Sequence, residues 1–365
     1  MNINISFNNT LFSVIGLLLC AFAFISTANE VRLKQPINTH NLVILQYHHV
    51  STQTPNSTSV SPAVFKSHMA FLSQNFTVID LAEAIEKIQS GQPLPNRSVV
   101  ITFDDGFKNI LDNGHPILEK YQFPYTIFIN PSLIGESPHQ LTWEQVKQMQ
   151  PLATFANHTL DHAHLLTKSD NEKTSDWLLR VMQDINQAEE ILQTKLGYSK
   201  KWLAYPFGEF NRALKEELLS QGYIGFGQQS GAVSAFSDFG ALPRFPAAGV
   251  YANLDSLETK LKSFAMPVKT IFPLDSQFKM GDSLDSLELL VEDEDVRLAA
   301  MACYFKGKTL PIKKAANMIT VEINHQLKPG RARINCTAPS NQFSDRFYWY
   351  SYPMFTATKD GNFLD

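Results

Sequence analysis

Two adjacent carboxylates, Asp104 and Asp105, are the residues of this chain best suited to chemistry. They end a β-branched and aromatic run that starts at Ser98, and Gly106 follows them. Such a run is typical of a buried strand in an α/β protein, so both acids are expected at its C-terminal end. Adjacent acids repel each other unless a cation neutralises one and leaves the other free as a base. An isolated Asp-Asp-Gly is also a common polar turn that caps a helix, so other residues must decide.

Two histidines further along the chain, His158 and His162, favour a metal site. Their spacing lets a helical turn or a tight loop aim both imidazoles at one ion. The pair is not a zincin motif, because Thr159 stands where the catalytic glutamate would follow the first histidine. With one aspartate they leave positions open for water, which suits a hydrolase and a non-haem iron oxygenase alike. The second carboxylate, Asp104, favours hydrolysis, because a hydrolase needs a general base and an oxygenase needs none.

Short apolar runs alternate with helical patterns between about residues 40 and 265, and this alternation predicts the scaffold. The expected strands are 42–47, 76–79, the run from Val99, 125–129, 153–156, 202–205, 223–226 and 242–245. The expected helices start at Ser61-Pro62 and Thr142, and elsewhere cover 81–89, 109–121, 177–192, 211–221 and 254–264. A parallel sheet follows, and a distorted (β/α) barrel is the economical way to build it.

Function in such a barrel belongs at the C-terminal ends of the strands. The candidate side chains that the expected strands place there are His48, His49, Asp104, Asp105, His158, His162, the segment Tyr205-Pro206-Phe207-Gly208, and Arg244. Structural histidines alone would have no reason to gather at one rim. The sequence therefore predicts a polar site there.

Three segments resemble the successive motifs of the polysaccharide deacetylases, carbohydrate esterase family 4. They are Thr102–Gly106, the His158/His162 pair and Tyr205–Gly208, and the resemblance covers roughly residues 40 to 265. The opening segment Leu45–Val50 further resembles the branch that includes exported poly-N-acetylglucosamine deacetylases, in which the order of motifs is circularly permuted. In that branch a histidine near the start takes the place of an acid found late in other members.

The resemblance implies a role for each matching residue. Asp105, His158 and His162 would hold a divalent metal, with zinc the expected ion, and Asp104 would be the general base. His48 would protonate the leaving sugar amine, whereas His49 is either a rim residue or a packing residue. Tyr205, Pro206, Phe207 and Gly208 would line the substrate site, with a backbone N–H near Phe207 helping the metal to hold the oxyanion.

One departure from the family pattern concerns the arginine that ordinarily orients the base. The third motif has this arginine before its proline, but Ala204-Tyr205 stands there in this chain. Arg244 could substitute from another strand, or it could be a structural residue. The other histidines have no partner at ligand spacing and are expected to be structural: His40, His68, His115, His139, His164 and His325.

Past Pro267 apolar strands alternate without helices, which predicts a small antiparallel β-sandwich over 268–365 after a catalytic domain over 29–267. Cys303 and Cys336 are the only cysteines beyond the N-terminal segment, and we expect them to form a disulfide that joins the two sheets. Trp349 and the neighbouring tyrosines could stack on sugar rings, but alternate aromatic residues in a strand are more often core.

The N-terminal residues 1–28 resemble a secretory signal peptide, with an apolar run from Leu11 to Ile25 and small residues before a cleavage site after Ala28. No Lys or Arg precedes the run, so an uncleaved membrane anchor is the alternative, and a lipid on Cys20 is disfavoured by Leu19. We therefore expect an exported protein, periplasmic or secreted. Its only contact with a membrane would be through this segment.

The composition bounds the remaining choices. A formal net charge of -4, from 31 basic and 35 acidic residues, argues against nucleic-acid binding, and no protein partner is evident. The expected reaction is hydrolysis of the N-acetyl amide of an amino-sugar polymer: poly-N-acetylglucosamine, peptidoglycan or a chitin-like chain. The alternatives are hydrolysis of an O-acetyl ester, hydrolysis of a non-sugar amide, and a catalytically silent carbohydrate-binding protein.

Overall fold

The computed structural model describes residues 1–2, 40–169 and 171–364. The described residues from 40 onward belong to one compact unit. Within the described part of the chain, no helix is both long and apolar enough to cross a membrane. The predicted signal peptide, residues 1–28, lies outside the described residues apart from Met1 and Asn2, so it stays a prediction.

A parallel sheet forms the centre of the first part of this unit. Its strands follow the order β10-β1-β5-β6-β7-β8-β9, and β4 pairs with β5. Their bounds are β1 Leu42–Tyr47, β4 Thr77–Val78, β5 Ser98–Asp104, β6 Tyr125–Ile129, β7 Ala153–Asn157, β8 Trp202–Ala204, β9 Ile224–Phe226 and β10 Phe245–Pro246. All residues of β1, β5 and β6 are buried, as expected for strands covered on both faces. The predicted distorted (β/α) barrel is confirmed.

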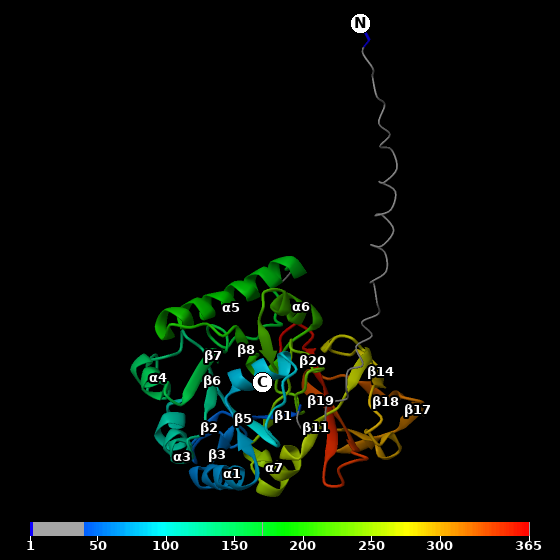
Figure 1. The fold of residues 1–365 in the computed structure, drawn as a ribbon, viewed down its shortest axis with the longest axis horizontal. Helices are drawn as coiled ribbons and strands as arrows, with labels where there is room; N and C mark the ends of the chain where they lie inside the picture. Colours follow the sequence, from blue (N-terminus) through cyan, green and yellow to red (C-terminus); the bar gives the residue numbers. More distant parts are fainter. Residues whose placement is uncertain (3–39, 170, 365) are drawn as a thin grey trace. The chain divides into compact units, whose positions relative to one another are not determined.

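Helices lie around the outside of these strands (Figure 1). They are α1 Pro62–Asn75, α2 Leu81–Gln89, α3 His115–Tyr121, α4 Trp143–Met149, α5 Thr174–Leu196, α6 Arg212–Ser220 and α7 Leu254–Leu261. Short turns of other helix types are η2 Ile110–Gly114, η3 Pro206–Gly208, η4 Gly249–Tyr251 and η5 Leu298–Ala300. Side chains cap several helices at their first turn, where the backbone N–H groups have no partner within the helix. The capping residues are Ser61, Asp80, Thr142, Asn211 and Asn253.

The barrel closes irregularly between β9 and β1. The sequence predicts one strand over 242–245, but Leu242 makes only an isolated parallel bridge to Phe226, and the ladder to β1 starts at Phe245. Pro243 lies between the two contacts and cannot donate a ladder hydrogen bond, which accounts for the break. The closing segment, residues 242–246, therefore contacts β9 through Leu242 and β1 through Phe245 and Pro246, at two separate places.

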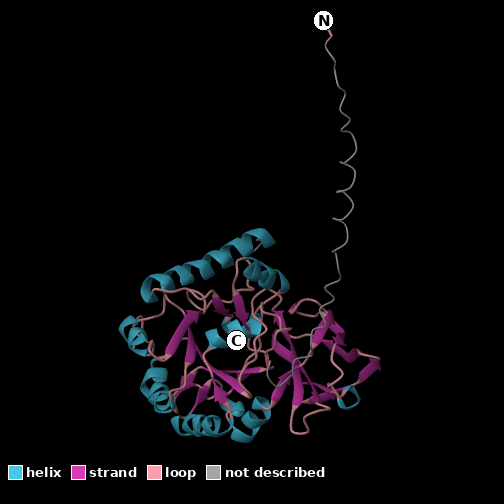
Figure 2. Cartoon of the chain, in the orientation of Figure 1, coloured by secondary structure: helices cyan, strands magenta, loops and turns pink. Residues whose placement is uncertain are grey.

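Two mostly antiparallel sheets make up the C-terminal part, which Figure 2 shows as a strand-rich region. One sheet contains β11 Ser263–Ala265, β13 Gln277–Lys279, β15 Ala302–Phe305, β16 Lys308–Leu310, β19 Gly330–Pro339 and β20 Phe347–Ala357. The other contains β12 Val268–Phe272, β14 Ser283–Val291, β17 Ile312–Ala315 and β18 Met318–Gln326. A small separate pair is formed by β2 His49–Val50 and β3 Ser59–Val60.

Three details of this region correct the sequence analysis. The helix predicted over 254–264 ends at Leu261, and Ser263–Ala265 instead pairs in parallel with β20, as β13 also does. The run from Arg297 to Phe305, whose residues predict a single strand, begins with the turn η5. Cys303 and Cys336 do form a disulfide, but they lie opposite each other on neighbouring strands of one sheet. The bond therefore ties β15 to β19 and does not join the two sheets.

The boundary between the two parts is not a clean one. A core cluster of buried side chains from both C-terminal sheets includes Phe264, Leu289 and Tyr348. However, Phe355 and Ala357 at the end of β20 are buried together with Trp177 of α5 and Leu214 of α6. The division at residue 267 stays a prediction, and the two parts share buried surface.

Candidate active site

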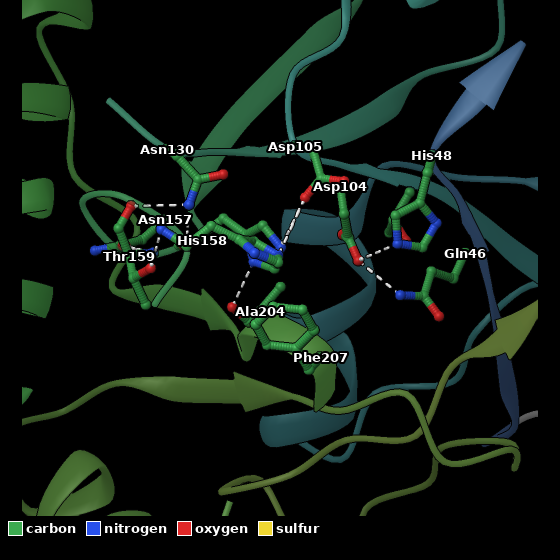
Figure 3. A network of polar contacts seen from close by, with 12 residues as sticks. Gln46, His48, Asp104, Asp105, Asn130, Asn157, His158, Thr159, Ala204 and Phe207 are labelled. Carbon is green, nitrogen blue, oxygen red and sulfur yellow. Dashed lines mark hydrogen bonds and ion pairs between the residues drawn. The ribbon is translucent and has the colours of Figure 1, made fainter. Parts of the chain in front are cut away.

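The candidate residues gather at the C-terminal ends of neighbouring barrel strands. Asp104 is the last residue of β5, and Asp105 follows it. His48 follows β1, and His158 follows β7. Figure 3 shows the two aspartates between His158 on one side and His48 with Gln46 on the other. The predicted rim site is therefore a real cluster.

Asp105, His158 and His162 form a compact group of potential metal ligands. One ligand atom from each lies within 4.8 Å of the other two. The Asp105 Oδ1 atom is 3.2 Å from His158 Nε2 and 3.4 Å from His162 Nε2. Asp105 Oδ1 and His158 Nε2 are buried and have no hydrogen-bond partner. Buried polar atoms without partners are costly, and a cation between them would satisfy both, so this donor set fits a divalent metal.

Local hydrogen bonds orient the His158 imidazole and shape the loop that carries His162. His158 Nδ1 lies 2.7 Å from the Ala204 carbonyl, which can accept the Nδ1 proton and leave Nε2 as the ligand atom. Burial, with the nearby His158, lowers the pKa of His162 to about 4, so that imidazole is neutral, as a ligand must be. The pair of histidines lies on a tight loop, not a helical turn. In that loop the Thr159 N–H donates to Asn157 Oδ1 at 2.7 Å.

Arg244, the candidate substitute for the motif arginine, contacts Asp104 directly. Its Nη1 donates to Asp104 Oδ1 at 2.7 Å and its Nη2 to Asp104 Oδ2 at 2.9 Å. Both side chains are fully buried. Burial alone would raise the pKa of Asp104, but the Arg244 charge, with His158 and His48, holds it well below the usual range. Asp104 is thus ionised and held in one orientation.

Gln46 is a site residue that the sequence analysis missed. Its Nε2 donates to Asp104 Oδ2 at 2.6 Å, and its side chain is almost fully buried. The available signal was a glutamine inside the otherwise apolar strand from Leu42 to Tyr47, because a buried amide needs hydrogen-bond partners. His48 lies on the same side, with Nε2 3.8 Å from Asp104 Oδ2.

His49 points away from the cluster and is a packing residue. Its ring stacks on Phe107 with centroids 3.8 Å apart, and its Nδ1 lies 2.9 Å from Asn109 Nδ2. Burial lowers the pKa of His49 to about 4. Successive residues of an extended chain point to opposite sides, so only one of the two adjacent histidines can face Asp104.

The Tyr205–Gly208 segment reaches the site through only part of its length. The Tyr205 side chain is fully buried, and its hydroxyl donates to the Gly240 carbonyl at 2.6 Å, which corrects its expected role as a substrate contact. Pro206 and Gly208 are buried as well. Phe207 is half-buried, and its ring lies 4.5 Å from that of His162. Phe207 is therefore the member of this segment whose side chain adjoins the ligand group.

Other histidines that were expected to be structural have partners away from the ligand group. His68 Nδ1 lies 3.0 Å from the Tyr47 hydroxyl, and His115 Nδ1 lies 2.7 Å from the Tyr125 hydroxyl. His164 is closer to the site, because its ring stacks on Phe207 with centroids 3.9 Å apart. Its Nδ1 lies 2.9 Å from Glu209 Oε2.

The fold and this cluster together define a (β/α)-barrel enzyme with a metal-hydrolase type of site. A family model described as polysaccharide deacetylase matches residues 91–225. The poly-beta-1,6-N-acetyl-D-glucosamine N-deacetylase of Staphylococcus epidermidis is 30% identical over 263 residues, which cover 65% of this chain and 88% of that protein. The Escherichia coli K12 protein of the same name is 25% identical over 292 residues, covering 69% of this chain and 42% of that protein.

Solved structures show the same fold. The Streptococcus pyogenes deacetylase PplD matches with a TM-score of 0.54 and 22% identity, over 61% of this chain and 99% of that one. IcaB from Ammonifex degensii matches with a TM-score of 0.53 and 23% identity, over 61% of this chain and 97% of that one. The chain belongs to the polysaccharide deacetylase family, which confirms the predicted family and the prediction of a hydrolase.

Proposed function

We propose that this protein is an exported, metal-dependent deacetylase that hydrolyses the N-acetyl amide of an N-acetylglucosamine polymer. The observation that carries the proposal is the pairing of an Asp105–His158–His162 ligand group with a second carboxylate, Asp104, held ionised beside it. Two relatives named poly-beta-1,6-N-acetyl-D-glucosamine N-deacetylases favour that polymer over peptidoglycan or a chitin-like chain.

The ligand group would hold the metal through Asp105 Oδ1 and one nitrogen of each histidine. When bound there, a divalent cation supplies a Lewis acid for the acetyl carbonyl and lowers the pKa of a water. The donor set of one carboxylate and two imidazoles suits zinc, which is the metal we propose. Neutral His162 needs to lose no proton to act as a ligand.

Asp104 would act as the general base. It accepts the proton of the attacking water, and the fixed guanidinium of Arg244 keeps its carboxylate aimed at that water. Because the Arg244 charge lowers the pKa of Asp104, the base is ready at neutral pH, although it is a weaker base than an unpaired carboxylate.

His48 would protonate the leaving amine. It lies on the opposite side of the carboxylates from His158, so a substrate amide between the two sides could receive a proton from His48. The backbone N–H of Phe207, beside His162, is the proposed donor to the oxyanion.

Export is proposed from the N-terminal apolar run and from the disulfide. The bond between Cys303 and Cys336 is typical of proteins in an oxidising compartment such as the periplasm or the exterior. The sequence from Leu11 to Ala28 resembles a signal peptide, which is consistent with export.

The proposal is tested by acetate release from N-acetylglucosamine oligomers of β-1,6 and β-1,4 linkage. We expect release from the β-1,6 oligomers, its loss on chelation and its return on adding Zn²⁺. Asp104→Asn should keep metal binding and lower kcat by roughly 10²–10⁴-fold, the usual contribution of a general base. The matched control is Asp112→Asn. Asp112 is an exposed acid a few residues after the end of β5, and its substitution should leave kcat unchanged.

The alternatives give different results in the same assay. Oligomer binding without acetate release would support a catalytically silent binding protein. Faster release from O-acetylated than from N-acetylated sugars would support an esterase. Release only from non-sugar amides would show that the substrate is not a sugar. An Asp104→Asn variant with full activity would remove Asp104 from the role of base.

A further inference from the structure

We propose that Arg331 and Arg333, on strand β19 of the C-terminal sheet, are positioning residues of the active site. This inference rests on the proposed function, and it makes the C-terminal sheet a working part of the enzyme. Both arginines lie outside residues 91–225, the part matched by the family model. The two arginines hold two separate segments of the barrel.

Arg331 holds the turn that carries Phe207. Its Nη1 donates to the Phe207 carbonyl at 2.8 Å, and its guanidinium lies 5.7 Å from the centre of the Phe207 ring. Phe207 has a φ of 56°, in the left-handed region that residues with a bulky side chain rarely adopt. Such a conformation persists only where the surroundings hold it, and Arg331 is one of the contacts that do so.

The Phe207 ring transmits this support to a proposed metal ligand. One face of the ring stacks on His164, and the ring meets His162 at 67° with centroids 4.5 Å apart. If the turn relaxed, the ring would move against His162. The backbone N–H of Phe207, our proposed oxyanion donor, would move with it.

Arg333 supports the second segment, residues 227–229. Its Nη1 donates to the Gln228 carbonyl at 3.4 Å, and its Nη2 donates to the Tyr251 hydroxyl at 3.0 Å. The two neighbours of Gln228 both hold Arg244. The Gly227 carbonyl accepts from Arg244 Nε at 3.0 Å, and the Gln229 carbonyl accepts from the Arg244 backbone N–H at 3.0 Å.

The two supported segments also pack against each other. A Cβ atom added to Gly208 would lie 2.7 Å from the Gln228 Cβ, so the turn at Phe207 and the 227–229 segment are in close contact. Together with Arg331 and Arg333 they line a groove of about 170 Å³. The segment beside His162 and the segment that holds Arg244 are therefore both contacted by strand β19.

Strand β19 is built to be a firm support. It pairs with β20 from Gly330 to Pro339, and the disulfide at Cys336 ties it to β15. Side chains alternate across a strand, so Ile334 and Cys336 are buried in the C-terminal core while Arg331 and Arg333 share the other face. The Arg-Ala-Arg sequence thus places two guanidinium groups on one side of a fixed strand.

Kinetics with a short soluble substrate test the proposal. Arg331→Met and Arg333→Met should each lower kcat about tenfold with KM changed less than about twofold, because displaced groups slow the reaction more than they weaken binding. Arg331→Lys, which keeps a donor, should recover part of the loss. Arg297→Met, at another exposed arginine of the C-terminal region, is the matched control and should match the wild type.

Hydrogen exchange of the metal-free protein gives a readout that needs no activity. Peptides covering 205–210 and 226–230 should exchange faster in the two Met variants, and a peptide from β6 should be unchanged. Unchanged exchange together with unchanged kcat would overturn the proposal. A raised KM with kcat unchanged would also overturn it, because the arginines would then contact substrate and not position the site.

Two outcomes need separate treatment. If a Met variant unfolds, seen as fast exchange of the β6 peptide, Arg331→Lys and Arg333→Lys decide. Wild-type exchange of these two variants at 205–210 and 226–230, with kcat recovered, supports the proposal. Fast exchange at 205–210 and 226–230 in the lysine variants, without any loss of kcat, contradicts the proposal. If the wild type releases no acetate, the proposed function fails, whereas the exchange result still shows whether β19 holds the two segments.

Discussion

The buried ion pair between Arg244 and Asp104 should contribute a measurable amount to the free energy of unfolding. Arg244→Met removes the only cation that hydrogen-bonds the fully buried Asp104 among the described residues. Two charge-assisted hydrogen bonds, of 2.7 and 2.9 Å, are lost at once. The carboxylate then stays in the interior without its counter-charge.

The size of the loss follows from what remains around Asp104. Removing one partner of a buried ion pair costs about 3–5 kcal/mol, because the other charge is left uncompensated. Gln46 still donates at 2.6 Å and His48 lies 3.8 Å away, so we expect the lower end, about 3 kcal/mol. Asp104→Asn leaves the guanidinium unpaired in the same way and should cost a similar amount, about 3 kcal/mol.

The double variant separates the ion pair from ordinary packing. Once one charge is gone, removing the other relieves the uncompensated burial, so the double variant should also lose only about 3 kcal/mol instead of the additive sum of about 6. The measurement is urea unfolding of the four proteins with chelator present, so that metal binding does not add to stability. Arg212→Met, at an exposed arginine paired with Glu216, is the control and should change stability by less than about 0.5 kcal/mol. Additive losses would refute the argument, since they would mean that the two charges do not depend on each other.

Two further predictions concern the buried polar side chains Gln46 and Lys260. Gln46→Met should lower kcat roughly tenfold and cost about 1–3 kcal/mol of stability, because Asp104 loses its 2.6 Å amide donor; acetate release and urea unfolding measure the two effects, and a variant with wild-type kcat would show that Gln46 does not orient the base. Lys260 is buried beside Arg333, and burial, with that charge, lowers its pKa from 10.5 to about 8. The folded state therefore binds fewer protons than the unfolded state between these values, so stability rises with pH across that range. Relative to Lys260→Met, the wild type should gain up to roughly 2 kcal/mol from pH 7 to 9.5 in urea unfolding, and a constant difference would contradict the lowered pKa.

Signals close together in the chain predicted the scaffold well. The bounds of β1, α2 and β6 agree with the sequence analysis, and the sequence marks two of these ends, with Asp80 before α2 and Asn130-Pro131 after β6. Asp80, for example, accepts from the Ala82 N–H at 2.7 Å, as a residue at that position before a helix should. Local signals failed where pairing decides the structure: Ser263–Ala265 continues a helical pattern but pairs with β20.

Contacts between distant residues explain what the sequence analysis could not resolve at the site. Arg244 and Asp104 are 140 positions apart, so the sequence left open whether the arginine was structural. The burial of Tyr205 was hidden for the same reason, because its hydroxyl partner, Gly240, lies on another loop. The register of β15 against β19 decides that the disulfide joins neighbouring strands, and no spacing of cysteines encodes that register.

The buried contact between Arg244 and Asp104 indicates what a carboxylate at this position physically requires. A buried carboxylate that must stay ionised needs a cation within hydrogen-bond distance, but any element that ends at the same rim can supply it. In this chain Ala204 stands before Tyr205-Pro206, and its carbonyl instead orients His158, while the cation comes from Arg244 at the closing segment of the barrel. A search for the missing residue should therefore ask which other strand end carries a basic side chain. Arg244 meets this condition although it comes directly before β10, because β10 pairs only with Leu45 and Gln46 in the C-terminal half of β1 and therefore begins close to the rim.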